Sequence, residues 1–427
     1  LNGKPFMPEA FPNERANALI DLAEKDGQRL GNGERRLIVD YAEACVGSKY
    51  AYYVGWFLTI IYYPCLTSVL SWLSARYTLV FITSIAPDFP LLGLGAAAGA
   101  ETVLGPECMS LAMFYMCCAY AVNALSPKLA GKLQVSTTII KLIPLFLMAI
   151  VGIVVGIANG TLANNFNTLA DVGTTSTSPL FASVCATAFA YEGWIIATSI
   201  NAELKDAKKN LPRALVIGAI IIIATYIFYY VGVAGGATNQ ELIDSGATVA
   251  FINVFGNVLG NILNLFIAIS CIGTMNGLML GCVRGLYSIA VRGRGPAPHV
   301  FSQIDKETNM PHNSAIVGLL LCGFWGLYFF LANLAGTWSG PFVFDSSELP
   351  IITIYMLYLP IFVMWIKKAT DETAMRRYVL PLLAICGSLF MIYASIMGHG
   401  IACFWYLIVF AAVMAVGFAF SKEKPIN

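Results

Sequence analysis

Charged side chains are scarce in this sequence, and their scarcity excludes most classes of protein. Only 11% of its 427 residues are Asp, Glu, Lys or Arg, whereas 58% are hydrophobic. Soluble globular domains carry about a quarter charged residues, so the composition predicts an all-α integral membrane protein. The net charge of +1 favours no particular partner. We expect the lipid bilayer as its surroundings, no nucleic acid, and no obligatory protein partner.

The sequence also lacks the patterns that support catalysis or metal binding. It has three histidines, of which His299 and His312 fall in predicted cytosolic loops and His399 in a predicted outside turn. The eleven cysteines fall mostly within apolar runs without a CxxC pair, so we expect neither disulfides nor a metal site. An intramembrane enzyme would need a nucleophile with its base, or a metal cluster, at membrane depth. We therefore predict that the protein is not an enzyme and holds no cofactor.

Long apolar runs, in contrast, are abundant. Ten runs of roughly 20 mostly apolar residues are each long enough to cross a bilayer. They cover residues 51–74, 108–125, 135–158, 179–200, 215–235, 259–290, 314–334, 350–366, 379–397 and 401–420. Basic residues gather in every second loop between them, and the loops of the other side contain only Arg76. By the positive-inside rule, this alternation predicts that both termini are cytoplasmic.

The chain is therefore expected to divide into a cytosolic polar segment, residues 1–49, and a transmembrane domain, residues 50–427. Within the polar segment, Asn13 precedes ERANALIDLAEK, which predicts an N-capped amphipathic helix. Two interpretations of this segment remain open. It is either a cytosolic or interfacial tail helix, or a loop that follows earlier membrane helices.

The most informative apolar run contains an acid beside a glycine, in the sequence FAYEGW from Phe189 to Trp194. A carboxylate at mid-membrane depth costs about 2.5–3.5 kcal/mol on insertion scales. Gly193 weakens the helix where Glu192 sits, and lipid cannot satisfy the backbone groups that a break exposes. Such a break is tolerated only against protein or a watery cavity, so it predicts a solute path. Phe189, Tyr191 and Trp194 either pack in the core or line that cavity.

Several other polar residues within the runs have two interpretations. Lys141 either extends its amine to the cytosolic interface or serves as a fixed cation inside the bundle. Asn276 is expected to form interhelical hydrogen bonds, and Arg284 to reach the interface or pair with a loop carboxylate. Asp345 and Glu348 are expected to be solvated charges at the outer mouth. Tyr226, Tyr229 and Tyr230 are packing residues unless one of them faces the cavity.

Four stretches, in order and spacing, resemble the amino acid–polyamine–organocation superfamily. The segment FAYEGWIIATSINAELKDAKKNLPRAL is similar to its sixth helix and following loop, especially in bacterial L-type transporters and serine/threonine exchangers. Trp56 and Pro64 match a tryptophan and a proline of the third helix, and Lys141 matches a lysine of the fifth. The stretch from Gly273 to Pro311, which contains Asn276 and Arg284, resembles the eighth helix and its loop.

The resemblance implies a leucine-transporter-type fold of twelve helices with two inverted repeats. It implies substrate binding at an interrupted sixth helix, and Lys141 in the place that a sodium ion occupies elsewhere in the fold. Tyr226 matches a tyrosine near the site in the seventh helix, and Phe189 is a candidate gate. The implied substrate-binding residues are Phe189, Ala190, Tyr191, Glu192, Gly193, Trp194 and Tyr226.

The first apolar run corresponds to the family's third helix, so ten of the twelve helices are expected here and the first two are missing. The Gly-Ser-Gly break of the first helix has no counterpart, which predicts an N-terminally truncated sequence or, alternatively, a naturally short form. We also expect that this 427-residue chain does not transport by itself.

The sequence thus predicts a multi-pass secondary permease of the plasma membrane. It would move a neutral amino acid by sodium-independent exchange or by proton-coupled uptake, with alternating access. The alternative is a permease-like amino-acid sensor or receptor subunit that binds without net transport.

Overall fold

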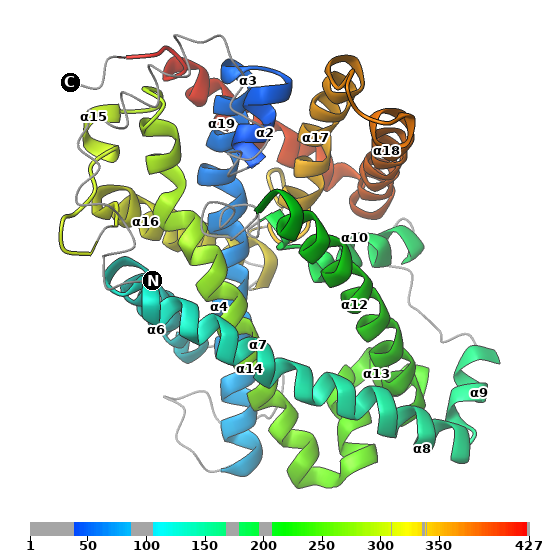
Figure 1. Cartoon of the computed structure of the whole chain (residues 1–427). Coiled ribbons are helices and arrows are strands. Elements are labelled where there is room, and N and C mark those ends of the chain that lie inside the picture. Colours follow the sequence, from blue (N-terminus) through cyan, green and yellow to red (C-terminus); the bar gives the residue numbers. More distant parts are fainter. Residues whose placement is uncertain are drawn as a thin grey trace, which may run out of the picture.

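The computed structural model describes residues 38–86, 106–167, 179–195, 207–308, 310–334, 338 and 340–424. The regular elements within these ranges are all helices (Figure 1). In chain order they are α2 (Ile38–Cys45), α3 (Ser48–Phe57), η1 (Leu58–Tyr62), α4 (Tyr63–Ile85), α6 (Pro106–Leu125), α7 (Pro127–Leu147), η2 (Met148–Gly152), α8 (Ile153–Ala158), α9 (Thr161–Asn167), α10 (Pro179–Tyr191), α12 (Ala207–Gly236), α13 (Asn239–Ser245), α14 (Ala247–Ala290), α15 (Pro298–Phe301), α16 (His312–Tyr328), η4 (Phe329–Leu334), α17 (Leu349–Lys368), η5 (Met375–Val379), α18 (Leu380–His399) and α19 (Ile401–Ala419).

Every predicted apolar run coincides with a helix. Nine helices in the described part of the chain are long and apolar enough to cross a membrane. The remaining run, residues 179–200, forms the shorter helix α10, which ends at Tyr191 just before the predicted break. The amphipathic helix predicted after Asn13 lies outside the described residues, as does the loop 196–206. The two-part division at residue 50 stays a prediction, although α2 already packs against α3 and α17 with Val39, Ala42 and Cys45 buried.

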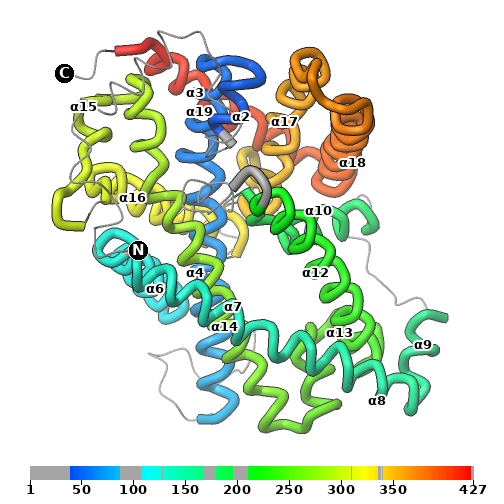
Figure 2. Tube along the Cα trace, viewed as in Figure 1, coloured from blue at the N-terminus to red at the C-terminus, as the bar shows by residue number. Residues whose placement is uncertain are grey.

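One long helix, built from α3, η1 and α4, runs through the middle of the bundle beside α14 (Figure 2). Its middle segment η1 is a π-helix, and Pro64 helps to explain the irregular geometry. Proline has no backbone N–H, so the carbonyl of Ile60 lacks its usual helical donor. The indole Nε1 of Trp325 donates to that carbonyl at 2.8 Å instead. Pro64 therefore couples the central helix to α16.

Trp56 holds the central helix against the last helix. Its indole Nε1 donates to the carbonyl of Val413 in α19 at 2.9 Å, and its ring lies against Gly417. A Cβ added at Gly417 would come within 2.7 Å of that ring. Nearby, the Tyr52 hydroxyl donates to the carbonyl of Gly417 at 2.8 Å. These contacts require a glycine at the crossing point.

Asn276 joins three helices by hydrogen bonds. Its Oδ1 accepts from Nδ2 of Asn123 in α6 at 2.9 Å, and its own Nδ2 donates to the carbonyl of Ala130 in α7 at 3.1 Å. The side chains of Asn123 and Asn276 are both buried. Interhelical amide bonds of this kind fix the register of apolar helices, which otherwise have few directional contacts.

Four glycines bring the backbones of two other helices into contact. Gly152 at the end of η2 and Gly156 in α8 face Gly232 and Gly235 in α12. A Cβ at Gly152 would come within 2.4 Å of the Gly232 carbonyl oxygen, and one at Gly235 within 2.3 Å of the Gly152 oxygen. Small residues at this spacing are typical of close helix crossings in membranes.

Candidate functional site

The candidate site is centred on a break after α10. The helix ends at Tyr191, Glu192 and Gly193 are not helical, and Trp194 and Ile195 are helical again. Gly193 has φ +111°, a conformation that glycine adopts far more readily than other residues. Residues beyond Ile195 are described again from Ala207. The break that the sequence predicted at Glu192 and Gly193 is thus present in the structure.

The Glu192 carboxylate faces the protein interior. Its Oε1 accepts a hydrogen bond from the hydroxyl of Tyr62, which is fully buried in η1. A buried charge or carboxyl group needs such a partner. Single-turn π segments recur at functional sites because they redirect side chains, and here the π segment contains Tyr62. The sequence analysis missed Tyr62, for which the available signal was a phenol two residues before Pro64 within an apolar run.

Aromatic residues from two further helices surround the break. The ring of Tyr226 in α12 lies 5.1 Å from that of Tyr191, and its hydroxyl donates to the carbonyl of Ala190 at 3.0 Å. The ring of Trp194 lies 5.7 Å from that of Tyr358 in α17. The structure therefore brings Tyr226 to the predicted break, and it adds Tyr358, which the sequence analysis did not single out.

Phe189 lies one turn before the break and beside a cleft of about 370 Å³. The cleft is lined by residues that include Trp72, Phe189, Phe329, Asn333, Asp345 and Glu348. Phe189 also packs against the hydrophobic core that contains Tyr62. Its ring thus lies between the cleft and the interior near Glu192. A cleft of this size is within the range of small-molecule sites.

The arrangement has a polarity suited to a cation. The C-terminal end of a helix carries a partial negative charge from its unpaired carbonyl groups, and α10 ends at Tyr191 beside the Glu192 carboxyl group. Both features favour an ammonium group. The Tyr62 hydroxyl donates to the Glu192 carboxylate, and the Tyr226 hydroxyl donates to the Ala190 carbonyl. These two hydrogen bonds also fix the conformation of the break.

Lys141 is not brought to this break by the contacts of the described residues. It lies in α7, partly buried, and its electrostatic neighbour is Cys271 of α14. The hydrogen bonds of Glu192, in contrast, involve the Tyr62 hydroxyl of η1 and the backbone carbonyl of Phe189. The coupling role that the resemblance assigns to Lys141 stays a prediction.

The role expected for Arg284 stays a prediction. Its side chain is partly buried in α14, and the ion pairs near this end of α14 involve Arg292 and Arg294. Arg292 pairs with Asp40 and with Glu43 of α2, the latter at 3.3 Å, and Arg294 pairs with Glu423 at 3.3 Å. These ion pairs could not be predicted from the sequence because the acidic partners lie near opposite ends of the chain.

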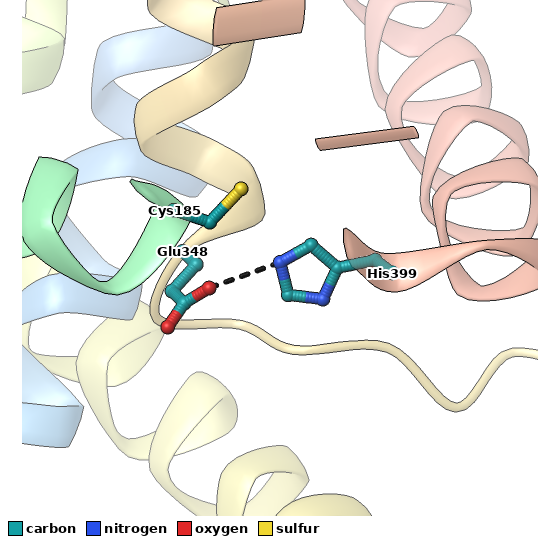
Figure 3. Close-up of side chains that lie close together, drawn as sticks. All are labelled: Cys185, Glu348 and His399. Carbon is teal, nitrogen blue, oxygen red and sulfur yellow. Dashed lines mark hydrogen bonds and ion pairs between the residues drawn. The ribbon is translucent and has the colours of Figure 1, made fainter. Parts of the chain in front are cut away.

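The expectation of a solvated entrance charge is wrong for Glu348, which is paired, whereas Asp345 lies partly buried at the cleft. Oε2 of Glu348 lies 3.0 Å from Nε2 of His399, and both side chains are largely buried (Figure 3). Oδ1 of Asp345 accepts the backbone N–H groups of Ser347 at 2.7 Å and of Glu348 at 2.9 Å. Asp345 thus closes the turn before α17 and fixes the position of Glu348.

Comparison with known proteins agrees with this architecture. The chain is 26% identical over 395 residues to the serine/threonine exchanger SteT of Bacillus subtilis (strain 168), covering 90% of this chain and 81% of that protein. It is 28% identical over 287 residues to the Asc-type amino acid transporter 1 of Mus musculus, and 26% identical over 294 residues to the b(0,+)-type amino acid transporter 1 of Rattus norvegicus. Those alignments cover 66% and 68% of this chain but only 50% and 57% of the relatives.

The sequence pattern of one family extends over nearly all of the transmembrane part. It matches residues 38–420, from the start of α2 to the end of α19. The matched region contains the central helix, the broken helix α10 and the tyrosines that contact the break. This multi-pass membrane protein therefore belongs to the amino acid permease family.

Proposed function

We propose that the protein is a secondary transporter that moves a neutral amino acid across the plasma membrane by alternating access. The observation that carries the proposal is the break after α10, where Glu192 is held by Tyr62 beside the C-terminal end of that helix. Interrupted helices at mid-membrane depth bind small charged solutes in several transporter folds. The relatives named as a serine/threonine exchanger and as amino acid transporters support this substrate class.

In the proposed mechanism, the substrate ammonium group binds at the negative end of α10 near Glu192. Aromatic residues at the break, chiefly Tyr191, Trp194 and Tyr226, surround the uncharged side chain. Phe189 separates this position from the outer cleft, so movement of its ring controls entry from that side. Transport then requires that the helices around the break rearrange to expose it to the cytosol.

The test uses the protein expressed from its complete gene in proteoliposomes. Vesicles preloaded with unlabelled serine should accumulate labelled serine faster than empty vesicles if the protein is an exchanger. Vesicles with an imposed proton gradient should accumulate it faster if uptake is proton-coupled. Binding of serine without flux under both conditions would contradict transport and favour the sensor alternative.

Glu192→Gln tests the role of the acid at the break. The substitution keeps the shape and the hydrogen bond from Tyr62 but removes the charge and the titratable proton. We expect uptake to fall about tenfold or more, since a charge-assisted contact contributes about 1.5–3 kcal/mol. The pH profile of the residual uptake should also shift. Identical profiles in the two proteins would exclude a proton-coupling role for Glu192.

Lys141→Ala tests the proposed sodium-substitute role. We expect uptake to be abolished or strongly impaired, whereas Lys132→Ala, an exposed lysine of the same helix, should leave it unchanged. The uptake assay is paired with a size-exclusion profile to confirm folding. Full uptake by the Lys141 variant would mean that its amine merely reaches the interface.

A further inference from the structure

A second cluster of polar side chains lies outside the proposed transport site. It consists of Cys185 in α10, Glu348 immediately before α17, and His399 at the end of α18. One ligand atom from each, the sulfur, a carboxylate oxygen and a ring nitrogen, lies within 4.8 Å of the other two. Figure 3 shows the three side chains converging from three different segments.

The backbone around each of these residues is fixed. Asp345 accepts the N–H of Glu348, and Gly400, with φ +53°, turns the chain into α19 directly after His399. Cys185 is fully buried and packs with Ile352 and Ala394, which lie about one turn from the other two ligands. A preformed site of this kind needs only small side-chain movements to close on an ion.

The ligand set selects a class of ion. A thiolate and an imidazole favour borderline-soft metals, whereas Mg²⁺ and Ca²⁺ prefer oxygen ligands alone. Three protein ligands of the Cys, His and carboxylate types are typical of a zinc site with an open fourth position. The negative charges of thiolate and carboxylate balance a divalent cation, which matters because the surroundings are largely apolar.

The site is accessible from the cleft, and its ligands hold protons that a bound ion would replace. Glu348 lines the 370 Å³ cleft, so an ion can reach the carboxylate without passing through the core. The ring nitrogen and the carboxylate oxygen are already 3.0 Å apart and share a hydrogen bond. A bound ion would take the place of that shared proton and of the thiol proton of Cys185, and release both to solvent.

We propose that Cys185, Glu348 and His399 bind Zn²⁺ with water in the fourth position, and that the bound ion ties α10 to the adjoining ends of α17 and α18. The sequence analysis predicted no metal site, because its search relied on local spacing and these ligands come from three distant segments. Since α10 leads directly to the break at Glu192, the tie restrains the helix that transport must rearrange. This inhibitory consequence rests on the proposed function, whereas the site itself does not.

The binding test uses the purified chain in detergent with Co²⁺ as a spectroscopic substitute for zinc. One equivalent of Co²⁺ should give a sulfur-to-metal charge-transfer band and tetrahedral visible bands, and Zn²⁺ should displace them. Cys185→Ser should remove the charge-transfer band, and His399→Ala or Glu348→Gln should weaken binding at least tenfold. Cys386→Ser, an exposed cysteine of α18, is the matched control and should retain the spectrum.

Size-exclusion profiles establish that each variant is folded, and the two variants at Cys185 and Glu348 change little volume. Absence of a stoichiometric band in the unmodified chain would mean that the cluster is an ion pair only. A band that persists in Cys185→Ser would place the metal elsewhere. Either result overturns the proposal.

A transport measurement then separates the two proposals. Zn²⁺ added outside should slow serine uptake by the protein expressed from its complete gene, and Cys185→Ser should remove most of that inhibition. Metal binding without serine flux would retain the site and contradict the proposed function. Serine flux without metal binding would support the proposed function and contradict the metal site.

Discussion

The central helix, from Ser48 to Ile85, and α12 both reach the break after α10 with a tyrosine, yet they differ in burial and in hydropathy. The central helix is almost entirely buried, whereas α12 is mostly exposed from residue 212 to residue 230 and becomes buried near its C-terminal end. The buried helix is also the less hydropathic of the two. Hydropathy therefore does not rank helices by burial inside a membrane protein, since lipid is as apolar as a protein core.

The composition of the two helices explains the difference. The central helix contains hydroxyl residues that bond within their own helix, such as Thr59 to the Gly55 carbonyl and Ser74 to the Leu70 carbonyl, each at 2.7 Å. These bonds satisfy polar groups where lipid could not. In α12, the four isoleucines from 220 to 223 are all exposed, which suits a surface toward lipid tails. Small and hydroxylated residues thus indicate a buried membrane helix better than apolarity does.

The largest expected effect concerns stability. Leu66→Ala in the central helix, where the side chain is 2% exposed, should lower the free energy of unfolding by about 2–5 kcal/mol because it leaves a cavity. Ile221→Ala in α12, 53% exposed, should change it by about 0.5 kcal/mol or less. Denaturant unfolding in mixed micelles measures both. Equal losses would remove the distinction between the two helices.

A smaller effect is expected for the two tyrosines at the break. Tyr62→Phe removes the hydroxyl that donates to the partly buried Glu192 carboxyl group and should lower serine uptake about tenfold, since a hydrogen bond to a charged group contributes about 1.5–3 kcal/mol. Tyr226→Phe loses only a hydrogen bond to the neutral Ala190 carbonyl, so its loss of uptake should be several times smaller than that of Tyr62→Phe. Tyr230→Phe, an exposed tyrosine of α12, is the control. A larger loss from Tyr226 than from Tyr62 would reverse the assignment.

The smallest effect lies just after α12, in the short helix α13. The backbone N–H and the hydroxyl of Thr238 both donate to Glu241, and they hold the pKa of that carboxyl below its ordinary value of 4.5. Because the folded-state pKa is the lower one, this contribution to helix stability is present above about pH 4.5 and is lost as the pH falls through the folded value.

Hydrogen exchange measures this local effect. Thr238→Ala should speed exchange of the α13 amides severalfold at pH 7, and the difference from the unmodified protein should shrink as the pH falls below about 4.5. Gln240→Ala, on the same helix but outside the capping pair, should change exchange less. A pH-independent difference would mean that the carboxylate of Glu241 does not participate.

The helix positions and the break could be predicted from the sequence because their signals are local. Runs of apolar residues fix where a helix can cross, and Glu192 beside Gly193 is a conflict that only a break resolves. The partners of these residues could not be predicted in the same way. Tyr62 and Glu192 are 130 residues apart, and Arg292 and Asp40 are 252 apart. Their pairing depends on how the helices pack, which apolar periodicity does not specify.

The close crossing of η2 and α8 with α12 limits how the molecule can move. Glycines 152, 156, 232 and 235 place backbone directly on backbone, with no side-chain layer to slide or repack. Separating these helices would open an unfilled gap along the whole contact. We therefore expect these helices to move as one rigid body. Tyr226 lies on the same helix as Gly232 and Gly235 and donates to the carbonyl of Ala190, so a rotation of that body would also displace this carbonyl.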